Sequence, residues 1–208
     1  MENILVITPI NHLNGVMNEL QKFGSIIYEP YISKNKLTRL LLENKNIEYL
    51  FTNPNKQGFI LDKEVLENTA IKVINTCSTG TNHIDKIYCQ KNNIDIWSLT
   101  TDYQLINDLP STSELAFGLM LSLLRKIPQS FNSVKQYKWD YEPFIGRQVK
   151  GLSLGVIGFG RLGKMMAHFG YSFGMKVCVY DPYVNEDLIL EINNHYKKVE
   201  IDELCSNV

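Results

Sequence analysis

Arginine is scarce in this sequence, and charge of either sign is nearly balanced. Only four of the 21 basic residues are arginines, and the formal net charge of the 208-residue chain is −1. The arginines are Arg39, Arg125, Arg147 and Arg161. A balanced charge gives no electrostatic footprint for nucleic acid or for an acidic membrane surface. We therefore expect neither nucleic acid nor membrane among the partners.

Paired cysteines, a leader and long apolar runs are also missing. The four cysteines are far apart and form no C-x-x-C pair; they are Cys77, Cys89, Cys178 and Cys205. This spacing favours reduced structural thiols over a metal or redox site, so no metal is predicted. The N-terminus has no basic region before its first apolar run and does not resemble a signal peptide. No apolar run could cross a bilayer, and we expect a cytoplasmic protein.

The first hundred residues alternate short apolar runs with helical patterns. The predicted strands are Ile4–Thr8, Ser25–Tyr28, Glu48–Thr52, Ile71–Thr76 and Ile94–Ser98. The predicted helices between them are Leu13–Phe23, Lys34–Asn44, Lys63–Asn68 and Ile84–Asn92. Strands that alternate with helices at this spacing indicate βαβ units and a parallel sheet, hence the α/β class.

A polar stretch over residues 100–110 breaks this pattern, and the longest helix follows at Ser111–Ile127. Ser111 precedes Glu114 by three residues, which predicts a capping box. Pro128 is expected to end this helix, with another over Gln129–Tyr137. The aromatic segment that follows, residues 137–144, suits an interface or a loop that caps the core, and both interpretations stay open.

Residues 155–163 carry a dinucleotide-binding fingerprint, Gly-Val-Ile-Gly-Phe-Gly-Arg-Leu-Gly. An apolar strand, Leu152–Ile157, leads into it, and a helical stretch, Arg161–Phe173, leaves it. A second β-rich run, Lys176–Tyr180, then ends on Asp181. An ordinary glycine-rich βαβ turn is the alternative, but strand, helix, second strand and acid together favour the fingerprint.

Each residue of the fingerprint has a physical role. Gly158 permits the tight turn, Gly160 leaves room for a pyrophosphate, and Gly163 lets the helix pack close to the strand. Free backbone N–H groups at Arg161 and Leu162, with the helix dipole, favour a diphosphate. Asp181 can accept hydrogen bonds from both ribose hydroxyls and repels a 2′-phosphate, so NAD is favoured over NADP.

After Asp181-Pro182 the sequence turns polar, with short helices predicted at Glu186–Asn194 and Ile201–Ser206. Only two full strands are predicted from the fingerprint onward. The first mononucleotide unit of a Rossmann fold needs three. We therefore expect the Rossmann domain to be incomplete at its C-terminus.

Four blocks of sequence support a family resemblance. They are residues 77–85 (CSTGTNHID), residues 111–128 with the long helix, residues 138–151 with Lys138-Trp139 and Gly146-Arg147, and the fingerprint through Asp181-Pro182. Together they cover nearly the whole chain from residue 71 in the right order. The chain resembles the NAD-dependent D-isomer-specific 2-hydroxyacid dehydrogenases, a group that includes phosphoglycerate and D-lactate dehydrogenases.

The resemblance implies a flavodoxin-like substrate domain over residues 1–102 and an NAD-binding Rossmann domain over residues 103–208, with the active cleft between them. It implies that Ser78, Thr79 and Gly80 bind the substrate carboxylate through backbone N–H groups, and that Thr79 also contacts the cofactor. A plain β-turn is the alternative for this loop. For the cofactor it implies the following binding residues: Gly158, Phe159, Gly160, Arg161, Leu162, Gly163, Asp181 and Pro182.

The family's catalytic histidine, its carboxylate partner and its substrate-binding arginine have no counterpart that we can assign in this chain. A histidine with a poised pKa is required for the proton transfer. His83 lies in the substrate loop and is interpreted as structural, His168 as a packing or surface residue, and His12 and His195 lack supporting context. We expect the catalytic residues beyond Val208 and the chain as given to be inactive.

The substrate is not specified. The loop Phe51-Thr52-Asn53-Pro54-Asn55-Lys56 has no arginine, and Lys56 lacks the bidentate fork that suits a phosphate, which weakens a phosphoglycerate assignment. The leading hypothesis is a fragment of an oxidoreductase that transfers hydride between NAD and a small D-2-hydroxy acid. The alternatives are a non-catalytic NAD-binding or regulatory module and an inactive fragment.

The resemblance implies a homodimer through the nucleotide domain, with the long helix and Trp139 as the contact surface.

Overall fold

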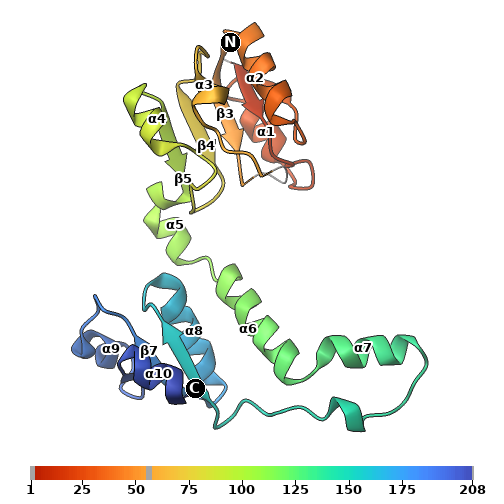
Figure 1. Ribbon diagram of the computed structural model, residues 1–208, viewed down its shortest axis with the longest axis vertical. Coiled ribbons are helices and arrows are strands. Elements are labelled where there is room, and N and C mark those ends of the chain that lie inside the picture. Colours follow the sequence, from red (N-terminus) through yellow and green to blue (C-terminus); the bar gives the residue numbers. More distant parts are fainter. Residues whose placement is uncertain (1–2, 55–57, 208) are drawn as a thin grey trace. The chain divides into compact units, whose positions relative to one another are not determined.

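The protein is described here from a computed structural model that covers residues 3–54 and 58–207. The chain divides into two compact units, Met1–Ile106 and Asn107–Val208 (Figure 1). Our expected functional boundary between residues 102 and 103 remains a prediction. Within the described ranges, no helix has the length and apolar character needed to span a bilayer.

The first unit is a five-stranded parallel sheet with connecting helices. Its strands are β1 (Asn3–Val6), β2 (Ser25–Tyr28), β3 (Ile47–Thr52), β4 (Val73–Thr76) and β5 (Asp95–Ser98). Its helices are α1 (Val16–Gln21), α2 (Lys34–Glu43), α3 (Lys63–Leu66), α4 (Lys86–Lys91), the 3-10 turn η1 (Leu99–Thr101) and α5 (Tyr103–Asn107). The strand order β2-β1-β3-β4-β5, parallel throughout, is the flavodoxin-like order. This part of the predicted fold is confirmed.

Alternation along β1 explains how this sheet is buried on both faces. Leu5 and Ile7 belong to one buried cluster, whereas Ile4 and Val6 belong to the other. Successive side chains of a strand point to opposite faces, so a strand covered by helices on both sides has an unbroken apolar run. The sequence Ile-Leu-Val-Ile therefore forms a central strand.

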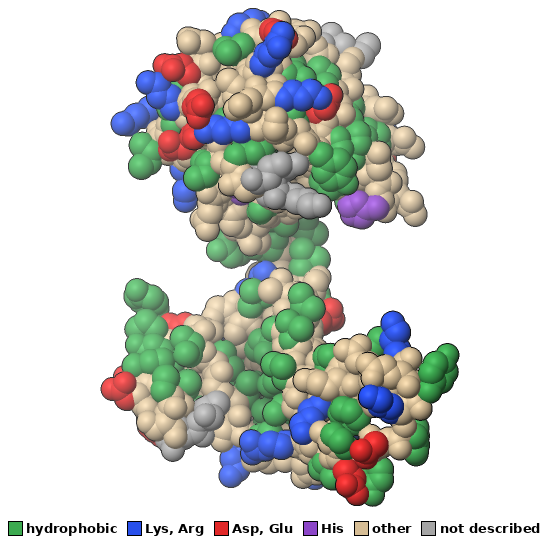
Figure 2. Space-filling model, turned by 45° about the vertical axis from the view of Figure 1, so that its right-hand side comes forward, with side chains coloured by type: hydrophobic (Ala, Val, Ile, Leu, Met, Phe, Trp, Pro, Cys, Tyr) green, Lys and Arg blue, Asp and Glu red, His purple; other side chains and the backbone are tan. Residues whose placement is uncertain are grey.

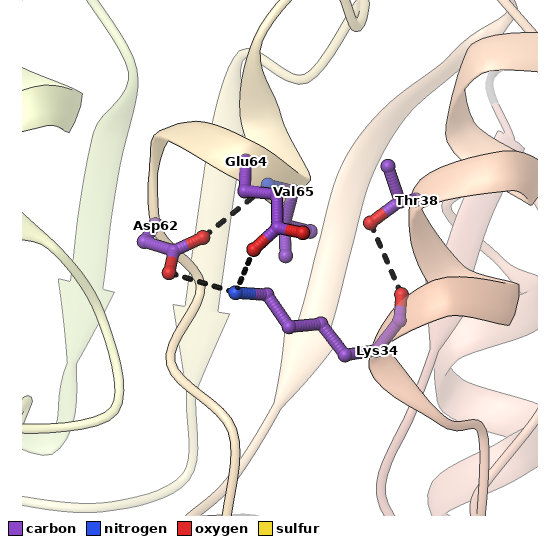
Figure 3. Close-up of polar contacts among 5 residues, drawn as sticks. All are labelled: Lys34, Thr38, Asp62, Glu64 and Val65. Carbon is purple, nitrogen blue, oxygen red and sulfur yellow. Dashed lines mark hydrogen bonds and ion pairs between the residues drawn. The ribbon is translucent and has the colours of Figure 1, made fainter.

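Polar side chains determine where several helices of this unit begin. Asp62 accepts a hydrogen bond from the backbone N–H of Val65 at 3.3 Å and caps α3. Lys34, at the start of α2, donates to Asp62 at 2.9 Å and to Glu64 at 2.5 Å (Figure 3). The same acid thus caps one helix and ties it to another.

The second unit contains a three-stranded parallel sheet in the order β6-β7-β8. Its strands are β6 (Ser153–Ile157), β7 (Lys176–Tyr180) and β8 (Lys197–Lys198). Its helices are α6 (Ser111–Leu124), α7 (Ile127–Lys135), the 3-10 turn η2 (Glu142–Phe144), α8 (Arg161–Ser172), α9 (Glu186–Ile192) and α10 (Ile201–Asn207). The order is that of the first three strands of a Rossmann sheet. The prediction of two strands missed β8, because two lysines give no apolar strand signal.

Close packing holds the helices of this unit to one another and to the sheet. Phe117 of α6 contacts Phe169 and Phe173, with ring centroids 5.8 and 4.9 Å apart. A Cβ on Gly170 would lie 2.4 Å from a side-chain methyl of Leu154 on β6. Gly170 therefore permits α8 to approach the sheet closely.

Two local expectations around α6 are wrong. Pro110 is the N-cap, and no side chain caps the helix among the described residues, so Ser111 and Glu114 form no capping box. The helix ends at Leu124, and the chain turns at Lys126 with φ 53°. Pro128 lies in the first turn of α7, where its missing N–H costs nothing, and is not the residue that ends α6.

The aromatic segment after α7 is exposed. Tyr137, Trp139 and Tyr141 have exposed fractions of 98%, 93% and 73%. A loop that caps the core would bury these rings. The exposure of these three rings favours the interface interpretation, which stays a prediction.

Candidate functional site

The glycine turn between β6 and α8 is held by backbone geometry. Gly158 has φ +86°, a left-handed conformation that favours glycine, and its N–H donates to the carbonyl of Tyr180 at 2.8 Å. Gly160 is the N-cap of α8 and, within the described chain, no side chain caps that helix. The first N–H groups of α8 are thus available to a ligand. The positive end of the helix dipole at the same N-terminus favours an anion there.

The two remaining glycines of the turn have different surroundings. A Cβ on Gly163 would lie 1.9 Å from the carbonyl oxygen of Gly158, so only glycine fits there. A Cβ on Gly160 would meet no described atom within 4 Å. Gly163 therefore serves helix packing, whereas the open side of Gly160 leaves space for a pyrophosphate. This geometry fits the cofactor expected from the sequence.

Asp181 lies directly after β7 and is almost completely buried, with an exposed fraction of 8%. Its Oδ2 accepts a hydrogen bond from the N–H of Phe159 at 2.7 Å. Its Oδ1 accepts from the N–H groups of Tyr183 at 2.8 Å and Val184 at 3.2 Å. These bonds, that from Phe159 first, hold the pKa of the Asp181 carboxyl below its usual value.

Three backbone donors change what Asp181 can offer to a ribose. A carboxylate has about four lone-pair positions, and three of them are occupied here. In this arrangement roughly one position remains, rather than the two that a pair of ribose hydroxyls would use. The sequence analysis did not predict the hydrogen bonds that Tyr183 and Val184 donate to Asp181. An aspartate followed by proline does favour a turn in which the aspartate accepts such bonds.

The other predicted residues of the turn are largely engaged with the protein. Phe159 is buried, its ring lies edge-on to Tyr196 with centroids 6.1 Å apart, and Lys164 Nζ lies 6.0 Å above it. Arg161 Nη1 donates to the carbonyl of Leu109 at 2.7 Å. The backbone carbonyl of Leu162 accepts from Ser113 at 3.3 Å. Pro182 is exposed beside Asp181.

Lys198 is a member of this site that the sequence did not indicate. It lies on β8 opposite Val179 of β7, and its Nζ donates to the carbonyl of Val184 at 2.7 Å. Its positive charge also lowers the pKa of Asp181. A lysine on a two-residue strand gives no sequence signal for such a role.

The predicted substrate loop of the first unit follows β4. Among the described residues, the N–H groups of Ser78, Thr79 and Gly80 donate to no backbone carbonyl, and Thr79 and Gly80 are exposed. Ser78 Oγ donates to the carbonyl of Gly80 at 2.7 Å and lies 2.9 Å from Thr76 Oγ1. This loop presents unpaired N–H groups of the kind that bind a carboxylate.

His83 lies within the sequence that follows this loop and contacts the end of β4, the strand before it. Its Nε2 lies 3.0 Å from Thr76 Oγ1, its exposed fraction is 8%, and burial lowers its pKa. A cavity of about 360 Å³ adjoins it. The cavity is lined by Pro54, Gly58, Phe59, Ile60, Ser78, Gly80, Asn82 and His83. Asn55 and Lys56, which bear on the phosphoglycerate assignment, lie outside the described residues.

No described histidine is paired with a carboxylate, and His12, His168 and His195 are exposed. His195 stacks on Tyr171 with centroids 5.4 Å apart. Within the described chain, no group of three His, Cys, Asp or Glu side chains is placed to hold a metal ion.

Curated relatives match the chain over most of its length. It is 28% identical over 211 residues to the D-3-phosphoglycerate dehydrogenase of Methanocaldococcus jannaschii, covering 99% of this chain and 37% of the relative. It is 33% identical over 153 residues to the D-3-phosphoglycerate dehydrogenase of Archaeoglobus fulgidus, covering 71% and 27%. The chain thus spans about a third of the length of the relatives it matches.

Solved structures and family models agree with these matches. The D-lactate dehydrogenase of Aquifex aeolicus, complexed with NAD and lactic acid, superposes with a TM-score of 0.74 at 25% identity, covering 99% of this chain and 58% of that one. The model for the family's catalytic domain matches residues 4–104, and the model for its NAD binding domain matches residues 117–208. Because the two models together account for most of the sequence, the chain belongs to the D-isomer specific 2-hydroxyacid dehydrogenase family.

Proposed function

We propose that the protein is an NAD-dependent oxidoreductase that acts on a small D-2-hydroxy acid. The observation that carries the proposal is the glycine turn of residues 158–163, with Asp181 hydrogen-bonded to Phe159 inside it. When bound, NAD supplies a nicotinamide ring that accepts or returns hydride. The N–H groups of the first turn of α8 bind its pyrophosphate, and Asp181 binds the adenine ribose.

The loop after β4 supplies the substrate side of the proposal. Ser78, Thr79 and Gly80 present backbone N–H groups that we propose hold the carboxylate shared by 2-hydroxy and 2-keto acids, and we propose Thr79 as a contact of the cofactor. The free thiols of all four cysteines suit the reducing cytoplasm that we propose as the setting.

A second candidate is an NAD-binding module without turnover. The observation that favours it is the lack of a carboxylate-paired histidine among the described residues, since a general acid and base is needed for the hydroxyl proton. We expect residues 1–208 alone to bind NAD and to show no NADH-dependent reduction of a panel of 2-keto acids. Measurable turnover by this chain would contradict that expectation.

Cofactor binding itself is tested by Gly160→Val. A Cβ at this position meets no described atom within 4 Å, so we expect the variant to fold, and its side chain extends into the space left for the pyrophosphate. We expect NAD affinity, measured by isothermal titration calorimetry, to fall by at least about tenfold. Glu191→Val on α9 serves as the control for surface change. Unaltered NAD affinity in a folded Gly160→Val variant would refute the proposed site.

We also propose a homodimer through the second unit. Leu115, Leu119 and Leu123, at helical spacing on α6, have exposed fractions of 65%, 56% and 75%. Phe131 on α7 and Trp139 are also exposed. Figure 2 shows hydrophobic side chains exposed on this unit. An exposed apolar stripe of this kind is typical of a protein–protein interface.

A further inference from the structure

We propose that the first unit carries a second ligand site, a cavity at the carboxyl ends of β1, β2 and β3 that takes an uncharged aromatic ring with a hydrogen-bonding group, such as a phenol. The ring belongs either to a separate small molecule or to the substituent of the 2-hydroxy acid itself. The first source goes beyond the proposed function, whereas the second rests on that function and deepens it.

The position of the cavity follows from the order of the strands. The chain runs from β1 to β2 on one side of β1 and then returns to place β3 on the other side. The loops separate at such a switch point, and ligands bind there, outside the carboxyl ends of the strands. A cavity of about 450 Å³, the switch-point cavity, lies at this place. Thr8 and His12 line it after β1, Tyr31 after β2, and Asn53 and Pro54 after β3.

The chemistry of the lining selects the kind of ligand. Among the described residues that line the cavity, none is lysine, arginine, aspartate or glutamate, so no fixed charge is available to pair with a charged ligand. Instead, the rings of Pro9, Pro30, Pro54 and Tyr31 present apolar faces. Small-molecule sites are lined in this way, with a few polar groups that orient the ligand. An uncharged aromatic ring therefore suits this lining better than a phosphate does.

Thr8 supplies a hydrogen-bonding group that the protein does not use. Its side chain is buried, with an exposed fraction of 8%. Within residues 3–54 and 58–207 its hydroxyl has no hydrogen-bond partner, yet no fully buried polar side-chain atom of these residues is left without one. The hydroxyl must therefore open onto the cavity that Thr8 lines. Because an unpaired hydroxyl in a buried setting is unfavourable, a polar group of a ligand stabilises it.

Asn53 supplies the second polar group of the cavity. It is half-buried, and its side-chain amide has no hydrogen-bond partner within the described ranges, whereas its backbone carbonyl accepts from Thr52 Oγ1 at 3.1 Å. An amide both donates and accepts hydrogen bonds, as a hydroxyl does. Thr8 and Asn53 together can therefore serve a phenol, which donates one hydrogen bond and accepts another.

Hydrogen bonds within the protein hold the loops that form the cavity. The hydroxyl of Tyr28, at the end of β2, accepts from the N–H of Ile10 at 3.1 Å and fixes the loop after β1. The N–H of Leu13 donates to the carbonyl of Ile10 at 2.9 Å, and the N–H of Ile32 donates to that of Glu29 at 3.2 Å. The cavity is therefore formed before a ligand binds, which lowers the cost of ordering the site.

Pro54 connects the switch-point cavity with the predicted substrate loop. It also lines the cavity of about 360 Å³ to which Ser78 and Gly80 contribute. A carboxylate on the loop and a ring in the switch-point cavity would therefore border the same residue. A 2-hydroxy acid with an aromatic substituent would use both cavities, whereas a separate phenol would use only the second.

The experiment follows backbone amides of the whole chain by two-dimensional NMR while a probe is added. The amides of Thr8 and Asn53 report on the switch-point cavity, and those of Thr79 and Gly80 report on the substrate loop. We expect p-cresol to shift the first pair alone and 4-hydroxyphenylpyruvate to shift both pairs. If 4-hydroxyphenylpyruvate binds at least about tenfold more tightly than pyruvate, the ring belongs to the substrate. If it binds no more tightly, the ring belongs to a separate molecule.

Two variants test the groups that form the cavity. Thr8→Val keeps the shape of the side chain and removes the hydroxyl, and Tyr31→Ser removes the aromatic face. We expect each to weaken p-cresol binding at least about threefold. Thr112→Val, which removes an exposed hydroxyl in the second unit, is the matched control and should leave the affinity unchanged. Because Tyr31 is 66% exposed, its variant should fold even if Thr8→Val does not.

Benzoate tests the preference for an uncharged ring. It resembles p-cresol in size but carries a charge that the described lining does not pair. We expect it to shift the amide of Thr8 with at least about tenfold lower affinity than p-cresol. Equal affinities would overturn the assigned ligand class.

The remaining outcomes separate this inference from the proposed function. The inference is overturned if neither ring probe shifts the amides of Thr8 and Asn53, or if p-cresol affinity is unchanged in both cavity variants. Calorimetry with NAD on the same sample tests the function by itself. A chain that binds p-cresol in the switch-point cavity but does not bind NAD supports the site and contradicts the function. The reverse result overturns the site alone.

Discussion

At the scale of single residues, Gly163 should be essential for packing. A Cβ at this position would lie 1.9 Å from the carbonyl oxygen of Gly158, and backbone cannot move aside as a side chain can. We expect Gly163→Ala to lower the free energy of unfolding by about 1–3 kcal/mol, as other overpacked sites do. Urea denaturation measures this loss.

Gly160→Ala is the matched control for this effect, because its Cβ meets no described atom within 4 Å. Its effect on stability should be much smaller. Equal losses in the two alanine variants would show that the close contact at Gly163 does not matter.

His83 should make stability depend on pH. Burial lowers its pKa in the folded protein below the ordinary value of 6.5, so the unfolded chain binds a proton first as the pH falls. Stability from this group is complete above about pH 6.5 and is lost as the pH drops through the window down to the folded pKa.

His83→Gln, which can still reach Thr76, should remove that dependence. Urea midpoints measured from pH 7.5 to 5 should fall less steeply in the variant than in the wild type. Parallel curves would mean that His83 is not buried in its neutral form.

At the scale of elements, the four-residue helix α3 should depend on its cap. Asp62 caps α3 and also pairs with Lys34, so Asp62→Ala removes the cap and one ion pair. Lys34→Met keeps the cap and removes the ion pairs of Lys34 with Asp62 and Glu64 (Figure 3). We expect Asp62→Ala to cost about 1 kcal/mol through the cap, and Lys34→Met to have the smaller effect.

Measurements at high salt separate the contribution of the Asp62 cap from that of the Lys34 ion pairs. In 1 M salt the effect of Lys34→Met on the thermal midpoint should shrink, because exposed pairs are screened. The effect of Asp62→Ala should largely persist. A larger loss for Lys34→Met than for Asp62→Ala would contradict the importance of the cap.

The helices and strands also show which sequence signals were sufficient to predict an element and its bounds. Lys176–Tyr180 was predicted as the second strand of the fingerprint, and β7 has these bounds, because alternation and β-branched residues are local signals. The capping box at Ser111 and the helix end at Pro128 were wrong, because Pro110 occupies the N-cap position and a left-handed residue, Lys126, follows the end of α6 before Pro128 is reached. Strand β8 is formed by pairing with β7, which no local pattern records.

At the scale of the whole molecule, the exposed stripe on α6 should mediate self-association. We expect the double variant Leu119→Glu/Leu123→Glu to be monomeric by analytical ultracentrifugation at concentrations where the wild type is a dimer. Ile87→Glu, at an equally exposed apolar position on α4, is the control and should remain dimeric. A wild-type protein that stays monomeric at every concentration used for ultracentrifugation would contradict the proposal.

The sequence by itself determined the fold class of both units and the positions of the glycine turn and of Asp181. These follow from hydrophobic periodicity and from the backbone freedom that only glycine allows, and both are local properties. Tertiary structure decided what Asp181 does before any ligand arrives. Its three N–H donors and Lys198 come from segments up to 22 residues away from Asp181 in the sequence, and only folding brings them together.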